Sequence, residues 1–232
     1  MRRWVRVVSE DLKNKVSNLT KAEITTLPIY IDIDKIQNAE ATFDLHDKYP
    51  WRFIMLAVSR LTQEKNLGLA LRILARVRKK FPSVGLVIAG SGPERGRLIS
   101  LARRLNLSGA VAFSGWHDEL ASLYKTANIF IQTSLYEGYG LALAEAGLSG
   151  LPVVTTPVGI ARDLIHEKEA LIFEANAPEK FVEGIIELVQ NNSMRDFLRI
   201  NLKQTLEAKL MGKEEYLSKI KAAWGRTLVR KK

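Results

Sequence analysis

The stretch Phe53-Ile54-Met55-Leu56-Ala57-Val58 decides the fold, because all six of its residues are apolar. A strand that is buried on both faces of a parallel sheet has such a continuous apolar run. From Phe53 onward, short apolar runs alternate with amphipathic helical stretches, which is the pattern of a parallel sheet with helices on both faces. The sequence therefore predicts an α/β fold with a Rossmann-like sheet. The further strands expected are Gly85–Ala89, Val111–Phe113, Asn128–Ile131, Pro152–Thr155 and Ala170–Phe173.

The chain divides into three predicted parts. Residues 51–210 form the sheet domain, and its helices are expected to begin near Asn66, Pro93, Asp118, Gly140, Ala161 and Pro178. Residues 1–50 contain only a strand at Val5–Val8, a helical stretch at Glu10–Leu19 and a short apolar run, which is too little for a domain. Asp32–Pro50 is polar, and we expect an irregular connector there. Residues 211–232 are expected to form a terminal helix, Lys213–Leu228, with a basic tail.

Composition excludes several classes of site. The chain has no cysteine, which rules out disulfides and cysteine nucleophiles and fits a reducing cytosol. His46, His117 and His166 lie far apart in the sequence, so we expect no metal site. The opening residues lack a signal-peptide core, and no apolar run approaches the roughly 20 residues of a membrane span. We therefore expect a cytoplasmic protein.

The formal net charge of +10 raises the question of an anionic partner. Arg76-Val77-Arg78-Lys79-Lys80 ends a helical pattern, where cations complement the negative end of the helix dipole. The C-terminal basic residues lack the interleaved aromatic side chains that stack on bases. We expect no nucleic-acid partner, and we favour peripheral contact with anionic lipid at the inner membrane face instead.

The segment Ser134–Ala146 runs from the end of a strand through glycines into a helix. Such turns lie at the carboxyl edge of a parallel sheet, and the helix N-terminus favours an anion such as phosphate. Glu137 and Glu145 would repel a phosphate, so they are better suited to accept hydrogen bonds from hydroxyls. The purely structural alternative is that Glu137 caps the helix and that Glu145 is solvated or paired with a cation.

Two carboxylates also suggest a glycoside hydrolase, whose acid and base flank one bond at roughly 5 to 9.5 Å. Eight helical residues would separate the backbones of Glu137 and Glu145 by roughly 12 Å, which disfavours this interpretation without excluding it. A second polar loop, Ser59–Asn66, follows the first strand and carries Arg60 and Lys65, which can balance a diphosphate. The glycines of Gly90–Glu94 mark a third strand-to-helix turn.

Together these motifs resemble the family-4 retaining glycosyltransferases of the GT-B type, over about residues 51–192. That family has an arginine and a lysine after the first strand of its C-terminal domain and a later pair of glutamates with seven residues between them. Here these positions are Arg60, Lys65, Glu137 and Glu145. Two departures, Ser59 and Asn66, stand where the family commonly has glycine.

The resemblance implies a role for each position. Arg60 and Lys65 would hold the diphosphate of a UDP- or GDP-linked sugar, Glu145 the ribose hydroxyls and Glu137 the hydroxyls of the transferred sugar. The catalytic residues would be Arg60, Lys65 and Glu137, and no metal or other cofactor would be required. The base would lie near Gly115–His117. Further donor-binding positions implied are Gly92, Trp116, Gly138, Tyr139, Gly140 and Leu141.

The resemblance also implies that residues 1–50 are a remnant of an N-terminal domain with its linker. The acceptor would then be held by a complementary N-terminal-domain polypeptide, and this chain alone would transfer sugar poorly. A second possibility is a binding or interaction module that keeps the sheet without catalysing transfer. Family analogy favours the assembly of a polysaccharide or glycolipid.

Overall fold

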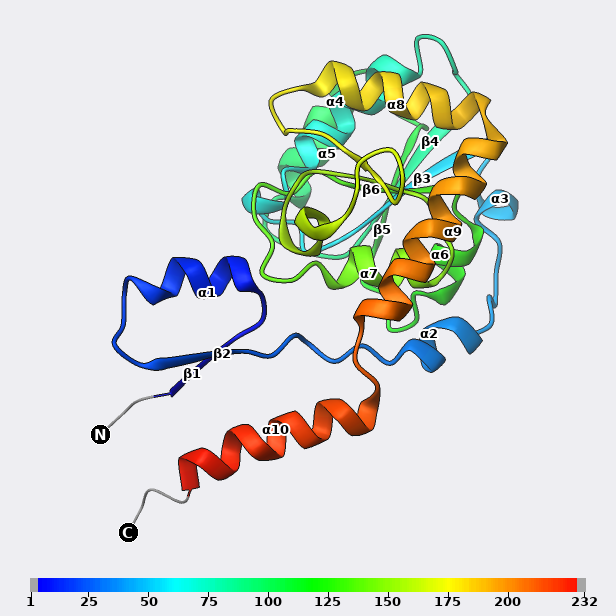
Figure 1. Cartoon of the computed structure of the whole chain (residues 1–232). Coiled ribbons are helices and arrows are strands. Elements are labelled where there is room, and N and C mark those ends of the chain that lie inside the picture. Colours follow the sequence, from blue (N-terminus) through cyan, green and yellow to red (C-terminus); the bar gives the residue numbers. More distant parts are fainter. Residues whose placement is uncertain (1–3, 229–232) are drawn as a thin grey trace.

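The computed structural model describes residues 4–228, so the basic residues Arg230, Lys231 and Lys232 lie outside the described part (Figure 1). Its main sheet has six parallel strands in the order β5-β4-β3-β6-β7-β8. This is the strand order of a Rossmann sheet. Strands β3 to β5 extend the sheet toward one edge and β6 to β8 toward the other, so the order of addition reverses between β3 and β6. The strands are β3 (Phe53–Val58), β4 (Val84–Ala89), β5 (Val111–Gly115), β6 (Ile129–Gln132), β7 (Val153–Thr155) and β8 (Leu171–Ile172).

Alternate residues of β3 enter two separate cores, because successive side chains of a strand point to opposite faces. Phe53 and Met55 pack in the core that includes α4, α5 and α8, whereas Ile54 and Leu56 pack in the core that includes α6, α7 and α9. Helices therefore cover both faces, as the sequence predicted. These helices are α4 (Leu67–Val77), α5 (Arg95–Arg104), α6 (Ala121–Thr126), α7 (Leu141–Leu148), α8 (Pro178–Gln190) and α9 (Asn192–Lys209).

The helix expected near Ala161 is wrong, since the structure has only a 3-10 turn there, η2 (Gly159–Asp163). The backbone N–H of Ile160 donates to the carbonyl of Tyr139 at 2.7 Å, so the start of this turn is tied to another loop. Gly159 has φ +57°, and a Cβ at this position would lie 2.3 Å from the same carbonyl oxygen. Close approach of two loops therefore requires glycine at this position and ties the start of the turn to the loop before α7.

The connector expected to be irregular contains two short helices, α2 (Ile33–Asn38) and α3 (Leu45–Lys48). Asp32 caps α2 by accepting from the backbone N–H of Lys35, and Asp44 accepts from the N–H of His46. These aspartates satisfy helix N–H groups that would otherwise lack partners, which explains helices in so polar a stretch.

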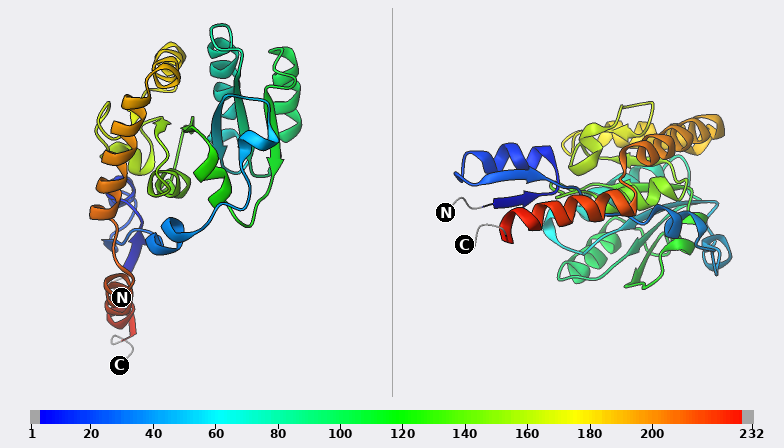
Figure 2. Two further views of the ribbon diagram at one scale, coloured as in Figure 1. Left: turned by 90° about the vertical axis from the view of Figure 1, so that its right-hand side faces the viewer. Right: turned by 60° about the horizontal axis from the view of Figure 1, so that its bottom comes forward.

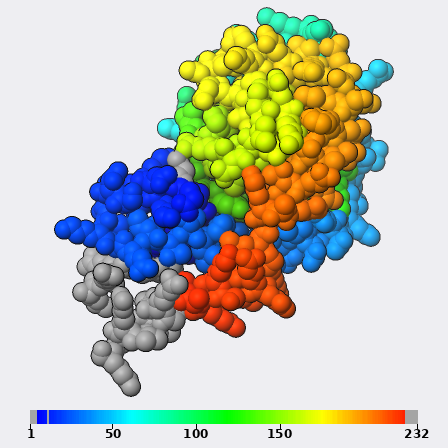
Figure 3. Space-filling model, viewed as in Figure 1, coloured from blue at the N-terminus to red at the C-terminus, as the bar shows by residue number. Residues whose placement is uncertain are grey.

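The N-terminal unit consists of β1 (Trp4–Val7), α1 (Glu10–Ser17) and β2 (Glu23–Thr26), with the two strands paired in parallel. The terminal helix α10 (Lys213–Leu228) lies beside this unit and outside the main sheet (Figures 1 and 2). Figure 3 shows both at the lower end of the molecule. Between residues 4 and 228, no helix has the length and apolar character needed to cross a bilayer.

Candidate active site

The loops that follow β3 and β6 meet where the strand order reverses, which is the place where open α/β sheets bind ligands. Lys65 ends the short 3-10 helix η1 (Gln63–Lys65) after β3, and Glu137 follows β6. The hydroxyl of Thr133 donates to the carbonyl of Asn66 at 3.0 Å and joins the two loops. Asn66 adopts the left-handed conformation, φ 48°, which asparagine tolerates better than most residues. Asparagine therefore serves at a position where the related family commonly has glycine.

Lys65 and Glu137 form a bidentate ion pair at this junction. Lys65 Nζ lies 2.8 Å from each carboxylate oxygen of Glu137, and the hydroxyl of Ser134 donates to Oε1 at 2.7 Å. The two charged side chains are only 14% and 13% exposed. Screening by water is weak at such burial, so the attraction between these charges is stronger than that of a surface pair.

A cavity of about 240 Å³ opens beside this ion pair. Arg60 lines it with a side chain that is 73% exposed and that lies 3.4 Å from Glu64. The loop before α7 forms another wall, and Gly140 adopts φ 101° just before the helix begins. A helix N-terminus, Arg60 and the Lys65–Glu137 pair thus border one cavity, and the helix N-terminus and Arg60 favour an anion there.

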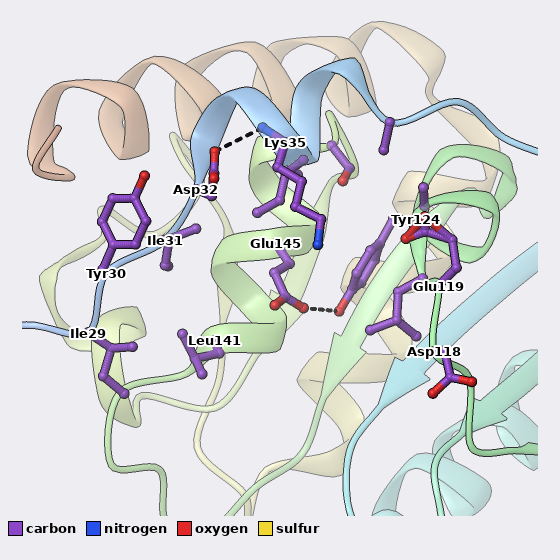
Figure 4. Close-up of a pocket in the computed structure, with 15 residues that line it drawn as sticks. Ile29, Tyr30, Ile31, Asp32, Lys35, Asp118, Glu119, Tyr124, Leu141 and Glu145 are labelled. Carbon is purple, nitrogen blue, oxygen red and sulfur yellow. Dashed lines mark hydrogen bonds between the residues drawn. The ribbon is translucent and has the colours of Figure 1, made fainter. Parts of the chain in front are cut away.

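Glu145, one turn into α7, lies in a second cavity of about 300 Å³ (Figure 4). The buried Tyr124 donates its hydroxyl to Glu145 Oε2 at 2.9 Å. Burial raises the pKa of the Glu145 carboxyl above its ordinary value, and the hydrogen bond from Tyr124 partly offsets this rise. Burial also raises the pKa of Tyr124 well above its ordinary value, with the charge of Glu145 adding to the effect. The tyrosine therefore stays protonated and acts as a donor.

The two cavities adjoin, because Ile29 and Leu141 line both. The cations and Glu137 stand at one end of this combined groove, and Glu145 stands at the other. Figure 4 shows Ile29 and Leu141 side by side at the edge of the larger cavity. The groove therefore has one part lined by two cations and an adjoining part lined by a carboxylate that can accept hydrogen bonds.

Not every predicted site residue lies in this groove. Tyr139, Gly140 and Leu141 line the smaller cavity, but the described linings of both cavities omit Gly92, Trp116 and Gly138. Trp116 is 71% exposed, and its indole N–H donates to Asp118, which does line the larger cavity. A Cβ on Gly92 would lie 2.5 Å from the carbonyl oxygen of Leu61, so this glycine allows two loops to approach each other.

Several lining residues carry no sequence signal. Tyr124 lies in a short helix whose apolar pattern indicates only a core position, and Lys35 belongs to the stretch expected to be irregular. Both reach the groove through tertiary packing. Over residues 4–228, no group of three or more histidine, cysteine, aspartate and glutamate side chains is arranged to hold a metal ion. The alternative in which Glu137 caps α7 is wrong, because the cap is Gly140 and no side chain bonds there.

The sheet order, with helices on both faces, is that of the α/β domains found in GT-B glycosyltransferases. Residues 39–205 match the family model described as glycosyl transferases group 1, and the chain belongs to this family. An uncharacterized glycosyltransferase of Methanocaldococcus jannaschii is 30% identical over 159 residues, which cover 67% of this chain and 40% of that protein.

Two further proteins illustrate the range of similarity. LpsE of Rhizobium meliloti, a lipopolysaccharide core biosynthesis glycosyltransferase, is 29% identical over 157 residues, covering 66% of this chain and 44% of LpsE. The Anabaena protein HepE, solved in complex with UDP and glucose, superposes with a TM-score of 0.85 at 17% identity, over 96% of this chain and 63% of HepE. The chain thus spans less than half the length of the two curated relatives.

Proposed function

We propose that this chain binds a nucleotide-diphospho-sugar and serves as the donor-binding part of a retaining glycosyltransferase. The observation that carries the proposal is the combined groove, in which Lys65 and Arg60 border one cavity and Glu145 the adjoining one. A nucleoside diphosphate has its hydroxyls and its charge in this order. The UDP and glucose bound in the HepE crystal structure belong to that protein and are consistent with this class of ligand.

Each side chain has a role that its surroundings support. Lys65 and Arg60 would hold the diphosphate and stabilise its negative charge as the bond to the sugar breaks. Glu145 would accept hydrogen bonds from ribose hydroxyls, with Tyr124 fixing the orientation of its carboxylate. Glu137 would accept from hydroxyls of the transferred sugar. Arg60, a helix N-terminus and Lys65, once it turns from Glu137 to the diphosphate, would supply the positive charge, so we propose transfer that needs no metal.

A hydrolase is less compatible with the smaller cavity. Among the described residues that line it, Glu137 is the only carboxylate, and it is paired with Lys65. A glycosidase requires a second carboxyl group across the scissile bond. The helical spacing of Glu137 and Glu145 disfavours a hydrolase only in part, because α7 begins at Leu141 and Glu137 precedes the helix.

The acceptor site is proposed to lie on a polypeptide segment that this chain does not contain, because the chain covers about two fifths of its relatives. Residues 1–50 would be the remnant of that N-terminal domain, and robust transfer would need the complementary part. The name of LpsE refers to lipopolysaccharide core assembly, and we propose a glycan or lipid-linked acceptor by analogy. Such an acceptor would place the protein in the cytoplasm at the inner membrane face.

Calorimetric titration with UDP, GDP, ADP and their sugar conjugates tests the proposal. We expect saturable binding of one nucleotide, weakened about tenfold or more by Glu145→Ala and by Arg60→Ala. Arg97→Ala is the matched control, since Arg97 is an exposed arginine that pairs with Glu94 outside the groove. If no nucleotide binds, the second candidate, an interaction module without catalysis, is favoured.

A further inference from the structure

The buried pair of Lys65 and Glu137 gives the proposed site an internal anion next to the place of the diphosphate. Both carboxylate oxygens of Glu137 accept from Lys65 Nζ at 2.8 Å, so the cation makes two charge-assisted bonds to this one partner. Lys65 has three N–H donors, and two of them bond to Glu137, so a diphosphate that takes Lys65 as its main partner competes with Glu137. The net free energy of binding is therefore that of the new lysine–phosphate pair minus that of the existing Lys65–Glu137 pair. It is smaller than the full free energy of a lysine–phosphate contact.

Arg60 has no comparable partner with which a diphosphate would have to compete. Its side chain is 73% exposed, and its contact with Glu64 is a single one at 3.4 Å. Exposed pairs of this kind contribute little, so Arg60 can turn toward a diphosphate at small cost. The two cations of the site therefore differ, because one is available and the other is already neutralised.

Drawing Lys65 away from Glu137 leaves a carboxylate that is only 13% exposed. The hydroxyl of Ser134 would remain as one donor to it, at 2.7 Å. A buried carboxylate with its cation removed carries a large desolvation penalty unless new donors arrive. Sugar hydroxyls are such donors, and a nucleoside diphosphate without its sugar has none to place beside Glu137.

We propose that the Lys65–Glu137 pair makes the site select the intact sugar donor over the spent nucleoside diphosphate. This inference rests on the proposed function and adds to it. When the intact donor binds, its diphosphate takes Lys65 while its sugar hydroxyls satisfy Glu137. When the nucleoside diphosphate binds alone, one of the two charges loses its partner. Glu137 is thus a specificity-determining residue that also favours product release.

Binding measurements on the wild-type protein alone test the inference. UDP, GDP and ADP are titrated by calorimetry beside UDP-glucose, GDP-mannose and ADP-glucose, and the nucleotide that binds is retained. We expect the sugar conjugate to bind several-fold more tightly than its nucleoside diphosphate. Equal affinity, or tighter binding of the nucleoside diphosphate, contradicts the selection. Failure of every nucleotide and conjugate to bind contradicts the proposed function itself, so the two failures are distinguishable.

Glu137→Gln then separates this role from simple contact with the sugar. The neutral amide cannot hold Lys65 as an ion pair, so we expect the nucleoside diphosphate to bind about tenfold more tightly than it does to wild type. The preference for the intact donor should fall by a similar factor. A residue that only contacts the sugar would leave affinity for the nucleoside diphosphate unchanged, and this outcome would overturn the inference.

Two controls accompany this variant. Glu174→Gln removes one negative charge from a neighbouring groove that includes Ser134 but not Glu137, and we expect no tightening. Equal tightening by Glu174→Gln would show a general charge effect and contradict the proposal. Ser134→Ala removes one hydrogen bond to Glu137 and leaves the ion pair in place, so it should not tighten binding. Circular dichroism and thermal unfolding establish that each variant is folded.

Discussion

The hydroxyl of Tyr124 in α6 donates to Glu145 Oε2 in α7 at 2.9 Å, which joins two helices at the larger cavity. A tyrosine of raised pKa keeps its proton, so this bond has a fixed direction. One oxygen of Glu145 is therefore engaged within the protein, and Oε1 is the oxygen better placed to accept from a ligand hydroxyl. The same burial that orients Glu145 also makes its negative charge costly to the folded state.

Glu145→Gln is expected to stabilise the fold at neutral pH. Burial raises the pKa of Glu145 above its ordinary value of 4.5, so the native state binds this proton more tightly than the unfolded state. Wild-type stability thus falls as pH rises through the interval between the two pKa values, and above it the penalty is constant. The variant should exceed wild type in free energy of unfolding at pH 7, and this difference should vanish below pH 4.5. Urea unfolding at both pH values measures it.

The control for this prediction is Glu183→Gln, which removes one negative charge from an exposed position in α8. It should not reproduce the pH-dependent gain. A variant at Glu145 that tracks wild type at both pH values would contradict the assigned pKa shift. Loss of nucleotide binding together with gained stability would mark Glu145 as a residue kept for function at a cost to the fold.

Ser59→Ala is expected to raise the free energy of unfolding by about 1 kcal/mol, because the Ser59 hydroxyl is buried without a hydrogen-bond partner in the structure. Ser59 also lines the smaller cavity beside Lys65. Denaturant unfolding measures the gain, and Ser83→Ala, at an exposed loop position, serves as the comparison. A destabilised variant would indicate that the hydroxyl has a favourable partner.

The sheet could be predicted from the sequence because its strands are continuous apolar runs, and all six expected strands are confirmed to within two residues at their ends. Lys65 and Glu137 could also be placed at one edge, since both follow strands of a parallel sheet. That they pair with each other could not be predicted. Adjacency of β3 and β6 is a property of strand order, and nothing local in either loop encodes it.

Other parts failed for identifiable physical reasons. The short helices α2 and α3 depend on aspartate caps, and each helix is too short to show a periodic apolar pattern in the sequence. The turn at Gly159 depends on contact with Tyr139, which is distant in sequence. The placement of Trp116 at the donor stays a prediction, since its exposed side chain lies outside the described linings of both cavities.

Gly90→Ala is expected to destabilise the fold by about 2 to 4 kcal/mol. Gly90 has φ 129°, and a Cβ there would lie 1.9 Å from the carbonyl oxygen of Ser59, a backbone atom that cannot turn away. Gly96→Ala is the matched control, because a Cβ at that position in α5 meets nothing within 4 Å. The control should be neutral or stabilising by up to about 1 kcal/mol. Equal stability of the two variants in urea would contradict the close loop approach.

Tyr216→Ala is expected to loosen α10 from the N-terminal unit without unfolding the main sheet. The Tyr216 hydroxyl accepts from Arg6 at 2.9 Å, and its ring lies 5.3 Å from that of Tyr30. Tyr216→Phe keeps the ring contact and removes only the hydrogen bond, so it separates the two contributions. Amide hydrogen exchange should rise in β1 and β2 for the alanine variant, rise less for phenylalanine and stay unchanged in β3 and β4. Unchanged exchange in β1 and β2 would show that α10 contributes nothing to holding this unit.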